Sequence, residues 1–128
     1  MKILIVEDDS IMLMVLKRIL QNFGYNVITA EDGKEGIEMI QLELPDMVIT
    51  DFNLPKISGF DIVFYLKHFT VKKIPVVLLS AMPNDGVNNN DKYVADAYLV
   101  KPVTPQILIN TIEKFSYPRM DKRDWAVA

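Results

Sequence analysis

Short runs of aliphatic and β-branched residues alternate along the chain with longer segments whose apolar residues recur at helical spacing. The first pattern predicts strands and the second predicts amphipathic helices. Strands are expected at residues 2–6 (KILIV), 26–30 (NVITA), 46–50 (DMVIT), 74–81 (IPVVLLSA) and 97–100 (AYLV). Helices are expected in residues 10–24, 31–43, 61–69 and 104–116. In the second of these segments, an Asp32-Gly33 turn is expected to precede a short helix.

Nearly every residue of these strands is apolar, which is typical of strands that are buried on both faces. A regular alternation of such strands with helices predicts an α/β fold, a doubly wound parallel sheet of five strands with helices on both faces. The 128 residues are enough for one compact domain with its own core.

Polar residues occur where the predicted strands end, a position at which open α/β sheets bind ligands. These residues are Glu7, Asp8 and Asp9 after the first strand, Asp51 after the third, Ser80 near the end of the fourth and Lys101 after the fifth.

The acidic residues among them indicate a bound cation. Carboxylates about 4 Å apart repel by roughly 4 kcal/mol per pair at an effective dielectric near 20, so several stay ionised together only with a cation among them. Oxygen ligands favour Mg²⁺, and beside it Asp51 has the chemistry of a nucleophile toward a phosphoryl group. Ser80 and Lys101 would then hold the transferred oxygens. Asp9 is expected to cap the following helix.

Composition narrows the function classes further. The chain has no cysteine and a single histidine, which excludes a disulfide framework and a thiolate or histidine zinc site. A formal net charge of −3 argues against direct binding of nucleic acid, which relies on a surplus of Lys and Arg on one face. No segment resembles a signal-peptide core or a membrane span, so we expect a cytoplasmic location without membrane insertion.

Four motifs, in order and at fitting intervals, make the chain resemble the receiver domains of bacterial two-component response regulators, in particular those of the chemotaxis-regulator type. The motifs are LIVEDD, DFNLPKISG, LLSA and AYLVKP. The resemblance covers residues 1–117 as a receiver domain and leaves residues 118–128 as a short C-terminal tail or the start of a linker. It implies a flavodoxin-like strand order 2-1-3-4-5 and a cis peptide bond between Lys101 and Pro102.

The resemblance also implies a role for each acidic residue of the rim. Asp51 corresponds to the phosphoacceptor of the family. The Mg²⁺ ligands would be Asp8, Asp51 and the backbone carbonyl of Asn53, with Glu7 acting mainly through water.

Three further residues correspond to the switch of such domains. Ser80 matches the switching hydroxyl, Tyr98 the rotating aromatic residue and Lys101 the lysine that pairs with the phosphoryl group. The implied function is a phosphorylation-activated signalling switch of a phosphorelay. The donor would be a histidine kinase or a phosphotransfer protein, and the output would pass to a downstream protein effector. Such a domain is not an enzyme, although it assists its own phosphorylation and dephosphorylation.

One segment departs from the family pattern. Between Ser80 and Tyr98 the family has a helix, whereas residues 81–97 contain Pro83, Gly86 and four asparagines. Asn and Gly each disfavour a helix by about 0.5 to 1 kcal/mol relative to Ala. The helix is therefore expected to be short or frayed.

Other classes fit the residues less well. An aspartyl-phosphate phosphatase of the haloacid dehalogenase type needs a second Asp two residues after the nucleophile, where Asn53 stands and cannot transfer a proton. A receiver-like interaction module that works without phosphorylation would not need the full set of rim residues. A flavin or dinucleotide protein would not place acids in the loop after the first strand, because they repel the cofactor phosphate.

Overall fold

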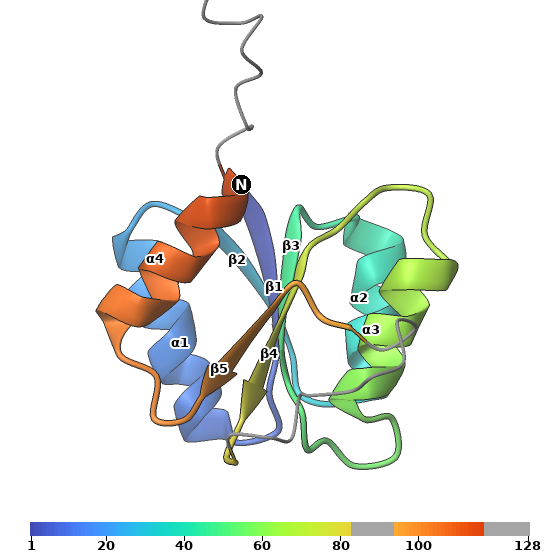
Figure 1. Cartoon of the computed structure of the whole chain (residues 1–128), viewed down its shortest axis with the longest axis horizontal. Coiled ribbons are helices and arrows are strands. Elements are labelled where there is room, and N and C mark those ends of the chain that lie inside the picture. Colours follow the sequence, from blue (N-terminus) through green and yellow to red (C-terminus); the bar gives the residue numbers. More distant parts are fainter. Residues whose placement is uncertain (83–93, 117–128) are drawn as a thin grey trace, which may run out of the picture.

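A five-stranded parallel sheet forms the centre of the computed structural model, which describes residues 1–82 and 94–116 (Figure 1). Neighbouring strands follow the order β2-β1-β3-β4-β5, which confirms the predicted fold class and strand order. The strands are β1 (Lys2–Val6), β2 (Asn26–Ala30), β3 (Met47–Asp51), β4 (Val76–Ser80) and β5 (Ala97–Val100).

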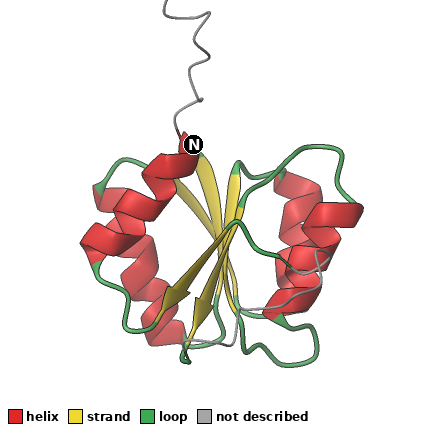
Figure 2. Ribbon diagram, in the orientation of Figure 1, coloured by secondary structure: helices red, strands yellow, loops and turns green. Residues whose placement is uncertain are grey.

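Helices cover both faces of the sheet, as predicted (Figure 2). One face carries α1 (Ser10–Asn22) and α4 (Pro105–Ser116), and the other carries α2 (Gly33–Glu43) and α3 (Gly59–His68). Alternate residues of each strand point to opposite faces, so the sheet has two cores. Leu16 and Leu108 pack into the first core, and Ile40 and Ile62 pack into the second.

The prediction that the strands are buried on both faces is confirmed for the three central strands and is wrong for the two edge strands. The residues of β3 and β4 are buried throughout, and those of β1 are buried apart from Lys2. In β2 only Ala30 is fully buried, and the residues of β5 alternate between half-buried and exposed. An edge strand has a neighbour on one side only, so apolar composition alone does not report its position in the sheet.

Side-chain caps set the starts of three helices. Asp9 caps α1, as expected, by accepting hydrogen bonds from the backbone N–H groups two and three residues later, at 2.9 and 3.2 Å. Ser58 and Asp61 form a reciprocal capping box at α3. Asp32 caps α2 directly, so the expected Asp32-Gly33 turn is instead the start of the helix, with Gly33 as its first residue.

Two expectations concern parts of the chain outside the described residues. The short or frayed helix between Ser80 and Tyr98 falls almost wholly in residues 83–93, and the tail falls in residues 117–128. Within residues 1–82 and 94–116, no helix combines the length and hydrophobicity that crossing a bilayer requires.

Candidate metal centre

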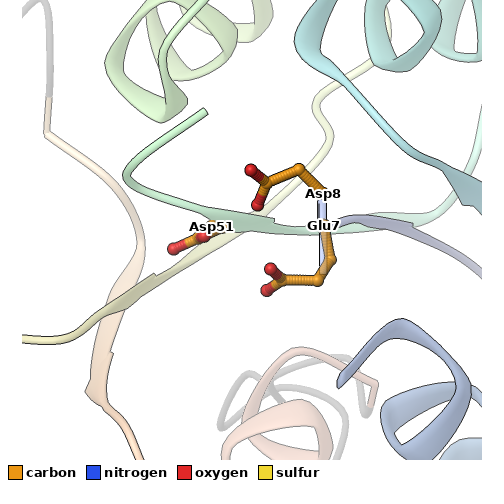
Figure 3. Close-up of side chains that lie close together, drawn as sticks. All are labelled: Glu7, Asp8 and Asp51. Atoms are coloured by element: carbon orange, nitrogen blue, oxygen red, sulfur yellow. The ribbon is translucent and has the colours of Figure 1, made fainter. Parts of the chain in front are cut away.

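Three carboxylates converge at the carboxyl edge of the sheet. Glu7 and Asp8 directly follow β1, and Asp51 is the last residue of β3. These two strands are neighbours, and the pairing of Val6 with Thr50 brings the next residue of each to the same level. One oxygen of each carboxylate lies within 4.8 Å of the others, and Figure 3 shows the three groups gathered at one place. The expected acidic rim is thus formed by the packing of two strands.

Lys101 supplies the positive charge of this rim. Its Nζ atom lies 3.1 Å from Glu7 Oε2 and 3.3 Å from Asp51 Oδ2. The residue follows β5, and the peptide bond from Lys101 to Pro102 is cis, as the resemblance implied. Three carboxylates and one ammonium leave two formal negative charges, which a divalent cation would balance.

Burial makes the charge on Glu7 costly. Its side chain is almost inaccessible to solvent, and this burial, together with the charge of Asp51, raises the pKa of Glu7. The hydrogen bonds that it accepts from Lys101 and from the Asp9 backbone N–H act in the opposite direction. Ionisation of Glu7 therefore destabilises the folded protein. The stability that the protonated carboxyl contributes is fully present below the pKa of the unfolded chain and is lost as the pH rises through the raised pKa. A cation beside the carboxylate would reduce the cost.

The same contacts keep Lys101 charged. Burial alone would lower its pKa, but the hydrogen bond to Glu7 and the negative charges of Asp51 and Glu7 outweigh it, so the pKa of Lys101 is raised. The ammonium group is therefore available as a fixed cation at neutral pH.

Asp51 is held by its own backbone surroundings. The Asn53 backbone N–H approaches Asp51 Oδ1 at 3.4 Å, and the Thr50 hydroxyl donates to the Asp51 carbonyl at 3.1 Å. The next residue, Phe52, donates its N–H to the Leu79 carbonyl at 2.7 Å. The Phe52 bond ties the end of β3 to β4, and the other two bonds hold the chain locally around Asp51.

Gly59 ends the DFNLPKISG motif, and the structure shows its physical role. A Cβ atom at this position would lie 2.5 Å from the Asp51 carbonyl oxygen, 2.7 Å from Leu78 Cδ1 and 2.8 Å from Phe52 Cα. Only a residue without a side chain lets the start of α3 pack this closely on the end of β3. No sequence pattern reports such an approach, because it depends on the packing of two elements.

The close approach at Gly59 can be tested by adding a Cβ atom at this position. Gly59→Ala should destabilise the domain by about 1–3 kcal/mol through overpacking. It should also weaken the response of the unfolding midpoint to Mg²⁺, because the strain falls on the Asp51 backbone. Urea unfolding with and without Mg²⁺ measures both effects.

Gly24→Ala serves as the control for this variant. It also strains the backbone, since Gly24 has φ +88°, but its Cβ atom would meet nothing within 4 Å. The control should lose stability while keeping the response to Mg²⁺. A Gly59→Ala protein as stable as the wild type would contradict the packing argument.

Ser80 and Tyr98 are engaged elsewhere in this structure. The Ser80 hydroxyl donates to the Met82 carbonyl at 2.6 Å and accepts from the Met82 N–H at 3.1 Å. The Tyr98 hydroxyl accepts from the Ala95 N–H at 3.0 Å, and the side chain is partly exposed. The expected rim residues are thus grouped in part: Glu7, Asp8, Asp51 and Lys101 are brought together, while both switch hydroxyls bond to nearby backbone.

Comparison with known proteins identifies the family to which this arrangement belongs. The family model of the response regulator receiver domain matches residues 3–113. The chemotaxis protein CheY of Pseudomonas aeruginosa is 33% identical over 117 residues, covering 89% of this chain and 94% of that protein. The crystal structure of a response regulator receiver domain protein from Clostridium thermocellum superposes with a TM-score of 0.81 at 35% identity, covering 89% of this chain and 92% of the other. The chain therefore belongs to the receiver domains of two-component response regulators.

Other relatives are longer than this chain. A probable transcriptional regulator, ycf27 of Cyanophora paradoxa, is 35% identical over 109 residues, which make up 84% of this chain and 44% of that protein. The alkaline phosphatase synthesis regulator PhoP of Bacillus subtilis is likewise covered over 44% of its length. The chain thus spans less than half the length of these relatives. Receiver domains are signalling domains that interact with kinases and effectors, and the acidic group of this one is compatible with a metal site.

Proposed function

We propose that this domain is a switch that accepts a phosphoryl group on Asp51 with the help of Mg²⁺. The donor is a histidine kinase or a phosphotransfer protein, and the output is a contact with an effector protein. The observation that carries the proposal is the convergence of Glu7, Asp8 and Asp51 with Lys101 at one rim of the sheet. Labelling by a small phosphoryl donor, compared between the wild type and Asp51→Asn, tests it.

The proposed transfer is a displacement at phosphorus. A carboxylate oxygen of Asp51 forms a bond to the phosphorus atom of a phosphohistidine, and the P–N bond breaks with its electron pair remaining on the imidazole. Asp8, Asp51 and the Asn53 carbonyl would hold Mg²⁺, with Glu7 acting mainly through water, and the ion would supply charge stabilisation at the phosphoryl oxygens. The Lys101 ammonium would pair with one of those oxygens, which its distance of 3.3 Å from Asp51 supports.

The proposed switch exchanges one set of hydrogen bonds for another. Ser80 would leave the Met82 backbone to bind a phosphoryl oxygen, and Tyr98 would leave the Ala95 N–H to turn inward. Each neutral hydrogen bond lost costs about 1 kcal/mol, while two or three charge-assisted bonds to the phosphoryl group are worth roughly 1.5 to 3 kcal/mol each. The new bonds total about 3 to 9 kcal/mol before the lost bonds are subtracted, so the net gain reaches the ~5.5 kcal/mol that shifts an equilibrium from 1:99 to 99:1 only toward the upper end of this range.

Met82 is proposed to influence the lifetime of the phosphorylated state. It lies two residues past Ser80, with its side chain exposed, and a thioether does not orient a hydrolytic water by strong hydrogen bonds. Met82→Glu should therefore speed the self-catalysed loss of the phosphoryl group several-fold, because a carboxylate can help to position the attacking water. The decay of phosphoprotein after removal of the donor measures this rate.

Met82→Gln is the matched control, since it has the same length as the Glu variant and no charge. Its decay should fall between those of the wild type and Met82→Glu. Decay that is unchanged or slower in Met82→Glu would count against the role of this position.

A further inference from the structure

Two adjoining grooves lie at the amino ends of the strands, opposite to the carboxyl ends where Asp51 lies. The first, of about 440 Å³, runs between the C-terminal ends of α2 and α3 and is called here the α2–α3 groove. Its apolar lining comes from Ile40, Leu44, Tyr65, Phe69 and Val71. The second, of about 570 Å³, shares Thr70, Val71 and Lys72 with the first and extends to Phe115 in the last turn of α4. Figure 1 shows that α4 ends at the same edge of the sheet as the connection from α3 to β4.

The walls of the α2–α3 groove expose an unusual amount of apolar surface. Phe69 is 67% exposed and Val71 is fully exposed, with Leu44 exposed on the opposite wall. The rings of Tyr65 and Phe69 are stacked with centroids 5.9 Å apart, which presents a flat aromatic surface. Contiguous exposed apolar patches rimmed by polar groups mark interaction sites, and aromatic residues are enriched at their centres.

Leu44 occupies a backbone conformation that does not favour it. It ends α2 with φ +43° and ψ 62°, the left-handed region in which Gly or Asn is usual at a helix C-terminus. It also precedes Pro45, which disfavours helical conformations at the preceding residue. An exposed leucine under these two constraints adds little to the stability of the uncovered domain. Its side chain has a physical use when something covers the groove.

We propose that the chain segment after α4, residues 117–128, docks in these two grooves and places Trp125 in the α2–α3 groove. The segment starts two residues beyond Phe115, at the rim of the second groove. At about 3.3 Å per residue it can reach roughly 40 Å, well beyond the ~14 Å radius of gyration expected for a domain of this size. It also carries apolar residues, namely Tyr117, Met120 and Trp125.

Covalent attachment favours this occupant over a free partner. A segment tethered by a short connection experiences an effective concentration in the millimolar range, so a weak intrinsic affinity is enough for substantial occupancy. The indole ring offers a large apolar surface with one N–H donor, which matches an apolar groove with polar groups such as Gln41 and Thr70 on its lining. The docking does not depend on phosphorylation at Asp51, because the grooves lie at the opposite ends of the strands.

Trp125 is the only tryptophan of the chain, so its fluorescence reports directly on the proposed contact. The experiment compares acrylamide quenching and the emission maximum of the full chain with those of a synthetic peptide of residues 117–128. The proposal expects several-fold weaker quenching and a blue-shifted emission in the full chain, both independent of protein concentration. Quenching equal to that of the peptide would overturn it. Shielding that disappears on dilution would also overturn it, because it would indicate a second copy of the chain as the occupant.

A groove variant distinguishes docking here from packing elsewhere. Leu44→Asn combined with Val71→Asp should restore peptide-like quenching, since both side chains lie on the groove surface. Asn tolerates the left-handed conformation of position 44, so the variant should fold, and circular dichroism checks this. Met14→Gln, which replaces an exposed apolar residue of α1 away from the groove, should leave Trp125 shielded. Shielding that persists in the folded groove variant would overturn the proposal.

Discussion

Asp51→Asn is expected to abolish covalent phosphorylation of this domain. In the wild type, acetyl phosphate and Mg²⁺ should add one phosphoryl group, seen by intact-protein mass spectrometry. An amide at position 51 is a far weaker nucleophile than a carboxylate and carries no charge to help hold the metal. Labelling should therefore fall to background.

Asp9→Asn is the matched control for this experiment. Asp9 belongs to the same acidic loop as Glu7 and Asp8, but its carboxylate caps α1, a role that asparagine also fills. Its labelling should equal that of the wild type. If Asp51→Asn were labelled to the wild-type level, the phosphoryl group would reside on another residue and the proposed function would fail at its central step.

Mg²⁺ is expected to stabilise the wild-type domain and to lose that effect in Asp8→Asn. A ligand that binds only the folded state at ten times its dissociation constant adds about 1.4 kcal/mol of stability. For a domain of this size, that corresponds to a rise of the thermal midpoint by roughly 4–8 °C. Asp8→Asn removes one of the three carboxylates that approach within 4.8 Å of one another, so most of the shift should disappear. Differential scanning fluorimetry at increasing MgCl₂ measures the shift.

Two controls separate binding from general salt effects. NaCl at the same ionic strength should leave the midpoint of the wild type nearly unchanged, and Asp9→Asn should keep the full response to Mg²⁺. The response should also weaken as the pH falls through the raised pKa of Glu7, because the protonated carboxyl no longer attracts the cation. An equal shift in Asp8→Asn and the wild type would show that the metal binds outside this group of carboxylates.

The strands, helices and rim residues of this protein were largely predictable from local sequence patterns. The apolar runs that end at Val6, Thr50 and Val100 placed the acids and Lys101 at strand ends, where the structure has them. The capping role of Asp9 followed from its residue type and its position before a helical segment. The burial of β2 and β5 was overestimated, because apolar composition does not distinguish an edge strand from a central one.

The sequence by itself determined the fold class and the kinds of chemical group at the strand ends, because periodicity and polarity are properties of neighbouring residues. Only the tertiary structure decided that β1 lies beside β3, that Glu7 is buried, and that Lys101 Nζ spans Glu7 and Asp51 at 3.1 and 3.3 Å. It also decided that the Ser80 hydroxyl bonds to the Met82 backbone and that α3 packs against the end of β3 at Gly59. Distances, burial and the pKa shifts that follow from them depend on contacts between segments far apart in the chain, which no local pattern encodes.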